Sequence, residues 1–354
     1  MEIRVDPEKI QKLVKEIFKA AGLKDDEAFT VSENLVQAEM RGIRSHGLVQ
    51  VANYVNLIRS KKINADAKIT LLREGPANLV FDAQNAPGSV AGKFAMEKTI
   101  EKAKKSGVAV TTVKNGTHFG FAAYYAMQAL KENMIGFAFT STGKAVAPFG
   151  GFEKMLGTNP ICVAVPAGEK RPVIFDAATS NVAYNKIFFA YTEGRSIPDN
   201  WGLTTNGSPT TNPADIIEKG GALLPFGSYK GYGLGFIVYI ITSLLAGVDV
   251  SEESGETAGE NYMQVAFNFA AIDISRFTEP ETFKKNLDIS IARLKASKTA
   301  PGISEILIPG EIEFKNYEKA QKEGLVLYEG VSSILRKSLE ELGLPGHLED
   351  CIIK

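Results

Sequence analysis

Two of the three histidines in the chain lie where a small molecule could approach them. His46 is in the segment RSHG (residues 44–47), and His118 is in NGTHFG (residues 115–120). A neighbouring glycine carries no side chain that would keep a ligand away. Because histidine takes up and returns protons near neutral pH, both are candidates for general acid–base catalysis. The third, His347, follows Pro-Gly near the C-terminus, where we expect a surface turn.

Ser45, directly before His46, allows two interpretations. It could be the nucleophile of a hydrolase that uses the adjacent histidine as its base. It could instead pass a proton to that histidine in a reaction without a covalent intermediate. The G-x-S-x-G segment that presents many nucleophilic serines is missing around Ser45, which favours the proton relay.

Two further segments could hold an anionic or hydroxyl-rich ligand. FDAATS (175–180) follows a short apolar stretch, and its Asp176 could bind ribose hydroxyls or cap a helix. Lys230 lies among glycines where an apolar helix is expected to begin, and backbone N–H groups at a helix start favour anions. The phosphate-binding patterns G-x-x-x-x-G-K-[ST] and G-x-G-x-x-G are both absent. A dinucleotide would therefore have to be held in another way.

The composition excludes several classes of protein. The 354 residues carry 40 basic and 41 acidic side chains, a net charge of −1, which excludes a surface built to track nucleic-acid phosphates. Cys162 and Cys351 are far apart, so we expect neither a disulfide scaffold nor a metal site. The N-terminal stretch lacks the apolar core of a signal peptide, and we expect a cytoplasmic protein.

An uncharged stretch at residues 231–248 reaches the lower length limit for a membrane span. Its glycines and hydroxyl residues, and the lack of a basic flank, favour a helix buried in protein on all sides. We therefore expect no contact with a membrane.

The elements that would position these residues follow from hydrophobic spacing. Helical spacing over residues 7–22, 26–41 and 45–60 predicts an N-terminal helical layer. Apolar runs and helical patterns then alternate, which predicts an α/β fold. We expect strands at 78–82, 108–113, 135–140, 161–165, 173–175, 264–272 and 305–308, helices at 90–105, 122–132, 280–296 and 331–342, and a long surface loop at 191–213.

Seven segments, in this order, resemble the malate/L-lactate dehydrogenase-like oxidoreductases, and their spacing is most similar to the ureidoglycolate dehydrogenase branch. The segments are RGIRSHG (41–47), NGTHFGFAAYY (115–125), APFGGFEKMLGTNP (147–160), FDAATS (175–180), IPDNWGLTTNGSPTTNP (197–213), LLPFGSYKGYGL (223–234) and APGISEILIPGE (300–311).

The resemblance implies a family-specific, non-Rossmann NAD(P)-binding α/β fold with an N-terminal helical layer. It implies hydride transfer between C4 of NAD or NADP and C2 of a small 2-hydroxy or 2-oxo acid of the malate, lactate, sulfolactate or ureidoglycolate type. It also implies a homodimer with active sites near the subunit interface. By this resemblance, residues 1–72 are the helical part of a substrate and dimer domain. Residues 73–250 are an NAD(P)-binding domain with a helical insertion, and residues 251–354 return to the core and dimer domain.

Site residues carried over by position fall into three groups. The catalytic group contains His118 as proton acceptor and His46 with Ser45 as a relay. The cofactor-binding group contains Ser141, Asp176, Ala177, Ala178, Lys230, Gly310, Glu311, His118, Phe119 and Gly120. The substrate-binding group contains Arg44, Gln50, Lys144 and Thr158.

The chain departs from the family pattern at the substrate site. Family members commonly have an arginine where this chain has Gln50, so a bidentate clamp on the substrate carboxylate is lost. Arg44 or Lys144 could replace it, or the substrate could carry a neutral polar group at that point. We favour replacement by a cation, because Lys144 is unusual for the family in this loop. Tyr184-Asn185 also replaces a small residue and a glycine before Lys186. Three alternatives stay open: a reductase of cyclic imine acids, a catalytically inactive nucleotide-binding protein of the same fold, and a hydrolase using Ser45.

Overall fold

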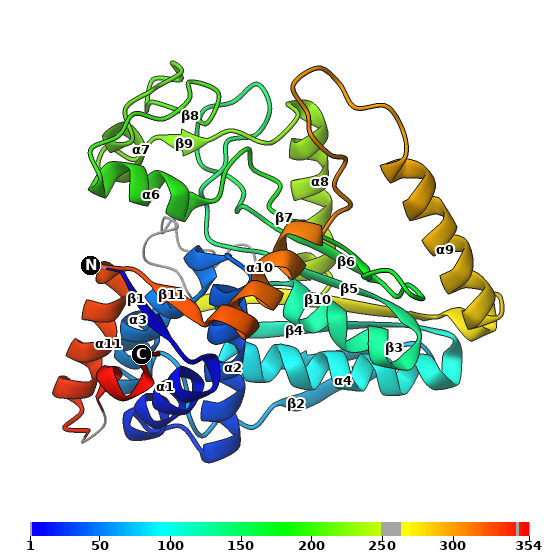
Figure 1. The fold of residues 1–354 in the computed structure, drawn as a ribbon, viewed down its shortest axis with the longest axis horizontal. Helices are drawn as coiled ribbons and strands as arrows, with labels where there is room; N and C mark the ends of the chain where they lie inside the picture. The colour runs from blue at the N-terminus through cyan, green and yellow to red at the C-terminus, as the bar shows by residue number, and fades with distance from the viewer. Residues whose placement is uncertain (1, 249–262, 345–346, 354) are drawn as a thin grey trace.

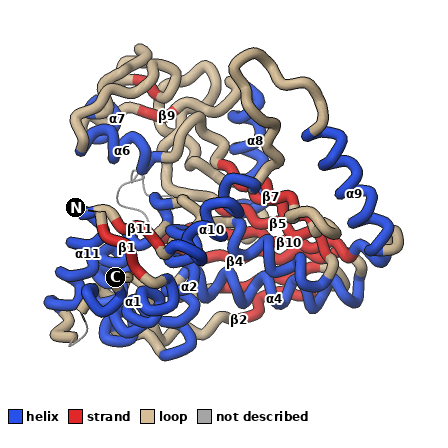
Figure 2. Tube along the Cα trace, in the orientation of Figure 1, coloured by secondary structure: helices blue, strands red, loops and turns tan. Residues whose placement is uncertain are grey.

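The computed structural model describes residues 2–248, 263–344 and 347–353. Its centre is a seven-stranded sheet in the order β2-β3-β4-β10-β5-β6-β7, with a helical layer at one end and a smaller lobe above it (Figures 1 and 2). The α/β prediction is confirmed. Among the paired strands of the described residues, β3 (Asn78–Asp82) and β4 (Val108–Thr117) are parallel and the other neighbours are antiparallel. The sheet is therefore not the parallel sheet of a Rossmann fold.

The central strand, β10 (Met263–Asp273), shows how the sheet is covered. Side chains of a strand alternate between its two faces. Phe267 and Phe269 are fully buried in a core shared with α4 (Gly88–Ser106), whereas Asn268 donates to Ile241 O at 2.9 Å on the other face. Helices α4 and α5 (Ala123–Ala126) thus cover one face and α8 (Tyr229–Tyr239) the other, as Figure 1 shows.

The N-terminal helical layer is confirmed. Helix α1 (Pro7–Ala21) begins at Asp6, whose carboxylate accepts from the N–H groups of Glu8 and Lys9, and it ends at Gly22. Helix α2 is Asp25–Met40 and α3 is Val51–Arg59. The layer is completed from the other end of the chain by β1 (Ile3–Val5) paired with β11 (Leu325–Leu327), and by α10 (Glu311–Glu323) and α11 (Glu329–Glu341). Both termini therefore lie in this layer.

The prediction of one helix over residues 45–60 is wrong in its first part. Two single 3₁₀ turns, Arg44–His46 and Leu48–Gln50, precede α3. Gly47 joins them, and a Cβ at Gly47 would lie 2.2 Å from a carboxylate oxygen of Glu39. The buried Glu39 side chain thus occupies the space under this segment, and the chain breaks into short turns around it.

Most other predicted elements are confirmed within a few residues. They are β5 (Met134–Thr140), β6 (Ile161–Val165), β7 (Val173–Ala177), α9 (Pro280–Lys295), α11, and the strands and α4 already described. The helix at 122–132 divides into α5 and a 3₁₀ turn at Met127–Glu132. The strand at 305–308 is wrong, because these residues form no regular structure and pair with no strand of the described residues. Helices and strands not predicted are β1, β2 (Thr70–Glu74), α6 (Tyr184–Thr192), β8 (Gly202–Leu203), α7 (Ala214–Ile217), β9 (Ala222–Leu223), α10 and β11.

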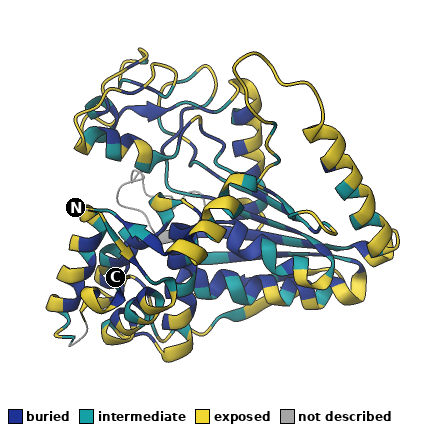
Figure 3. Ribbon diagram, in the orientation of Figure 1, coloured by how far each residue is buried: buried dark blue, intermediate teal, exposed yellow. Residues whose placement is uncertain are grey.

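The uncharged stretch 231–248 is not a helix buried on all sides, which corrects our expectation. Helix α8 continues as a π-helical turn at Ile240–Leu244, and its outer face is open in the single chain. Figure 3 shows exposed positions along this helix. Ile237 is 52% exposed and Leu245 58%. No helix in the described part of the chain is long and apolar enough to cross a membrane. The division at residues 72 and 250 stays a prediction.

Candidate active site

A cavity of about 1080 Å³ lies where the 3₁₀ turns of the helical layer meet the end of β4, α6 and the start of α10. Most residues named from the sequence line it. They are Arg44, Ser45, His46, Gln50, His118, Phe119, Gly120, Ser141, Thr158, Asp176, Ala177, Ala178 and Gly310. Lys144, Lys230 and Glu311 are not among its lining residues. The described residues contain no group of three side chains that could hold a metal ion.

The two histidines from distant segments lie face to face in this cavity. Their ring centroids are 5.4 Å apart with planes inclined by 19°. Ser45 Oγ is 2.8 Å from His46 Nδ1, which is hydrogen-bond distance, and the relay role of the two residues stays a prediction. The hydroxyl of Tyr54, on α3, is 2.5 Å from His118 Nδ1. Sequence reasoning missed Tyr54, because an aromatic residue at helical spacing is typical of a core position.

Both histidines are neutral at pH 7. Burial lowers the pKa of His46 to about 4. Burial, with a smaller contribution from the neighbouring His46, lowers the pKa of His118 to about 3. A neutral imidazole has a lone pair on one ring nitrogen and a proton on the other, so each ring can accept a proton from a hydroxyl group.

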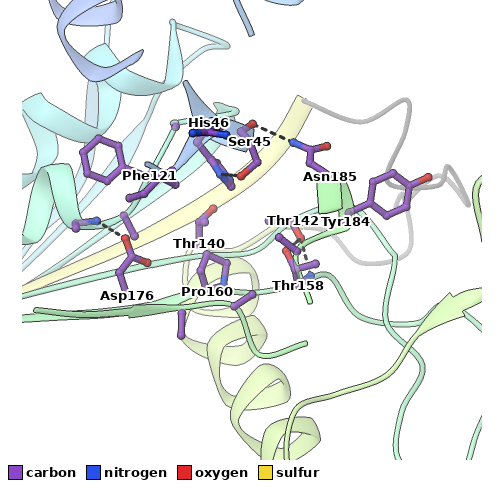
Figure 4. A pocket seen from close by; sticks show the side chains of 18 of the residues that line it. Ser45, His46, Phe121, Thr140, Thr142, Thr158, Pro160, Asp176, Tyr184 and Asn185 are labelled. Carbon is purple, nitrogen blue, oxygen red and sulfur yellow. Dashed lines mark hydrogen bonds between the residues drawn. The ribbon is translucent and has the colours of Figure 1, made fainter. Parts of the chain in front are cut away.

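Gln50 is a structural part of the loop that holds His46. Its side chain is only 5% exposed, and its amide donates to Ser45 O at 2.9 Å. Asn185, at the start of α6, donates to the same carbonyl at 3.0 Å (Figure 4). Gln50 and Asn185, both singled out in the sequence analysis, therefore meet on one backbone oxygen.

Glu39, near the end of α2, contacts the same loop through its carboxylate. It is 4% exposed, and its carboxylate accepts from Leu48 N at 2.9 Å. Burial raises the pKa of Glu39 to about 7, while the Leu48 N–H and the charge of Arg44 act in the opposite direction. Sequence analysis gave no signal for this residue, since acidic residues are common on helices.

Three cationic side chains of the described residues line the cavity: Arg41, Arg44 and Lys186. Arg41 is 8% exposed and lies over the rings of Tyr317 and Phe314. Arg44 is exposed, and its guanidinium lies 3.9 Å from the ring centroid of Tyr328. Lys186 extends from the first turn of α6, next to Asn185.

The part of the cavity lined by Asp176 and Phe175 offers groups that could bind a dinucleotide. Asp176 is open to the cavity and accepts from Ala123 N at 2.8 Å. Surrounding protein raises the pKa of Asp176 to about 6, against the effect of this hydrogen bond. Beside it, Phe175 is exposed and offers a flat apolar face. Gly120 and Gly310 both have positive φ, and a Cβ at these positions would collide with Asn34 and Ile174, so packing within the protein requires both glycines. The carboxylate of Asp176, which can bind ribose hydroxyls, beside an exposed aromatic ring therefore fits the cofactor.

Two predicted cofactor residues, Lys230 and Glu311, do not line the cavity. Lys230 is exposed in the first turn of α8. Glu311 forms an ion pair with Lys295 at 2.7 Å and accepts from Ile308 N at 3.0 Å. Ser141, by contrast, does line the cavity. Its Oγ accepts from Ala266 N at 3.1 Å, which holds the Ser141 side chain against β10.

Comparison with known proteins agrees with this geometry. A profile of the malate/L-lactate dehydrogenase family matches residues 5–336. An L-sulfolactate dehydrogenase from Methanocaldococcus jannaschii is 38% identical over 347 residues, 98% of each chain. A ureidoglycolate dehydrogenase from Escherichia coli K12 is 32% identical, over 94% of this chain and 95% of its own. The solved malate dehydrogenase of Pyrococcus horikoshii superposes with a TM-score of 0.89 at 33% identity, covering 98% of this chain and 97% of its own. These identities do not favour the ureidoglycolate relative over the other two.

Proposed function

Because the chain belongs to the malate/L-lactate dehydrogenase family and is an NAD(P)-dependent oxidoreductase of small hydroxy acids, we propose that His118 and His46 move the proton in this reaction. The observation that supports this most directly is the stacked histidine pair, 5.4 Å apart, inside the large cavity. The cyclic-imine and inactive-protein alternatives are not favoured by the comparisons.

Proton transfer by the histidines would accompany hydride transfer at C2 of the substrate. A bound nicotinamide ring supplies the hydride acceptor in one direction and the donor in the other. During oxidation, His118 accepts the substrate hydroxyl proton, and during reduction it returns that proton to the forming alkoxide. His46, held by Ser45, lies against the His118 ring and would relay a proton between this site and Ser45. His118→Ala lowers kcat by about a hundredfold or more, and near-normal turnover would contradict the assignment.

We propose that Arg44 and Lys186 bind the carboxylate of the substrate in place of the missing arginine, with Thr158 beside them. Both cations line the cavity, and Lys186 is carried by the helix turn that contacts the His46 loop through Asn185. Gln50 instead holds the loop. Lys144 is the alternative cation, between the cavity residues Gly143 and Ala145.

The substrate site is tested with 2-oxo acids of the malate, lactate, sulfolactate and ureidoglycolate types, using NADH and NADPH in turn. Lys186→Met and Arg44→Met each raise the KM of the preferred acid by about 10- to 100-fold, the value of a charge-assisted hydrogen bond. Lys144→Met is the matched control and leaves KM unchanged. The reverse pattern, a large effect of Lys144→Met alone, would assign the carboxylate to Lys144.

We also propose that two copies associate through the outer face of α8. This face exposes Leu234, Phe236 and Ile237, a contiguous apolar surface of the kind that proteins cover by association. Lys230 lies on the same helix, so its predicted contact with a cofactor would be made at or near that interface. Ile237→Glu makes the enzyme a monomer in light scattering after gel filtration. A monomeric wild-type protein would refute the dimer.

We also propose that the protein is cytoplasmic. Cys162 and Cys351 are free and buried, as expected for a protein of a reducing compartment. Recovery of the protein in the cytosolic fraction after cell fractionation is expected, and recovery from the medium would contradict it.

A further inference from the structure

We propose that Tyr54 is a positioning residue that keeps a proton on Nδ1 of His118, so that the substrate exchanges its proton with Nε2 alone. This inference rests on the proposed role of His118, and its test is chosen so that the two can fail separately.

The position of Tyr54 links two parts of the fold. Its ring is 5% exposed and packs in the core of the helical layer, 6.4 Å from the ring of Phe18 on α1. Its hydroxyl leaves that core and reaches His118, which follows the end of β4. The helical layer thereby fixes the plane of a side chain that belongs to the sheet.

The hydrogen of the Tyr54 hydroxyl has a second acceptor. The hydroxyl oxygen lies 2.5 Å from His118 Nδ1 and 3.5 Å from the backbone oxygen of His118. When the hydroxyl hydrogen is directed to that carbonyl, the phenolic oxygen can accept a hydrogen bond from Nδ1–H. In this arrangement the neutral ring has its lone pair on Nε2, the nitrogen not held by Tyr54.

The hydrogen bond between Nδ1–H of His118 and the Tyr54 oxygen can form with both the neutral and the protonated ring. As the substrate O–H bond breaks, its proton forms a new N–H bond at Nε2, and the hydride leaves C2 with its electron pair. The ring then carries a positive charge, and Nδ1–H still donates to Tyr54. Tyr54 keeps its own proton throughout, so it orients the base and stabilises the imidazolium without exchanging a proton.

The opposite tautomer would block the reaction. If Nδ1 accepted from the hydroxyl, the proton of neutral His118 would be on Nε2, and that nitrogen would have no lone pair to accept the substrate proton. In wild-type protein, ¹⁵N-resolved NMR of the His118 ring should therefore show the Nδ1–H tautomer. A ring protonated at Nε2 would overturn the inference without any variant, and would leave the family assignment untouched.

The variant Tyr54→Phe removes only the hydroxyl. We expect kcat to fall about tenfold, the value of one hydrogen bond, with little change in the KM of the acid. The acid limb of the kcat profile for oxidation moves to lower pH, because the imidazolium loses its acceptor. NMR of the variant should show a mixture of His118 tautomers, and near-UV circular dichroism confirms that it has folded.

Tyr124→Phe is the matched control. Tyr124 is also buried, but its hydroxyl donates to Glu33 and not to a histidine. This variant should keep the wild-type kcat, pH profile and His118 tautomer. Unchanged kcat and tautomer in Tyr54→Phe would overturn the positioning role. An active His118→Ala enzyme would instead overturn the proposed function on which the role rests.

Discussion

Glu39→Gln should make the enzyme more stable at alkaline pH, although it removes a buried charged residue that supports the active-site loop. The substitution keeps the shape of the side chain, and its amide oxygen can still accept from Leu48 N. It removes the ability to ionise, which is unfavourable in this buried position.

The direction in which stability changes with pH follows from the pKa of Glu39 in the folded and in the unfolded protein. Burial raises the pKa of Glu39 to about 7 in the folded protein, whereas the ordinary pKa of a glutamate exposed to water is 4.5. Above pH 4.5 the unfolded chain loses a proton that the folded protein retains, so stability falls as pH rises through 7. With about 1.4 kcal/mol per pH unit of difference between the two pKa values, Glu39 costs the wild type about 2.5 kcal/mol more at pH 8 than at pH 5.

The assay is urea unfolding of the wild type and Glu39→Gln at pH 5 and pH 8, followed by circular dichroism. The variant should gain about 2.5 kcal/mol relative to the wild type between these pH values. Glu153→Gln, at an exposed loop position, is the control and should show no such gain. A Glu39→Gln difference that is the same at both pH values would refute the reasoning, because it would show that Glu39 is ionised in the folded protein at pH 5.

Three further outcomes are expected. Gly47→Ala destabilises the protein by about 1–3 kcal/mol, since the new Cβ would lie 2.2 Å from a Glu39 oxygen; unchanged urea unfolding would contradict this. The ring protons of His46 and His118 show no titration between pH 6 and 8 by NMR, because burial lowers the pKa values to about 4 and about 3; a midpoint near 6.5 in either would show that the ring is not desolvated. Lys230→Ala raises the KM of the dinucleotide more than that of the acid; equal changes would show that Lys230 has no cofactor role.

The sequence was sufficient to find the histidine pair and the type of fold. His46 and His118 stand out because glycine flanks both, and a functional histidine must leave room for its ligand. Strands such as β3 and β6 were predicted at their observed bounds, because a buried strand needs an uninterrupted run of apolar residues.

What the sequence could not predict depends on contacts between distant segments. Tyr54 and Glu39 look like an ordinary core aromatic and an ordinary helix acid, and only packing brings them to the His46 and His118 loops. Gln50 lines the cavity as expected, but its hydrogen bond to Ser45 O could not be predicted, because a backbone acceptor has no sequence signature. The segment 305–308 has strand-forming residues but no neighbouring strand to pair with.

The place of β10 in the sheet has a consequence for synthesis on the ribosome. This strand lies between β4 and β5, yet it follows both by more than a hundred residues. Until residues 263–273 have left the ribosome, β4 and β5 each have an unpaired edge, and such edges attract other chains. The nascent protein must therefore keep two incomplete half-sheets apart from the synthesis of β5 until the synthesis of β10. A chain truncated before residue 263 should aggregate or bind chaperones, and a soluble, protease-resistant fragment would show that the half-sheets need no central strand.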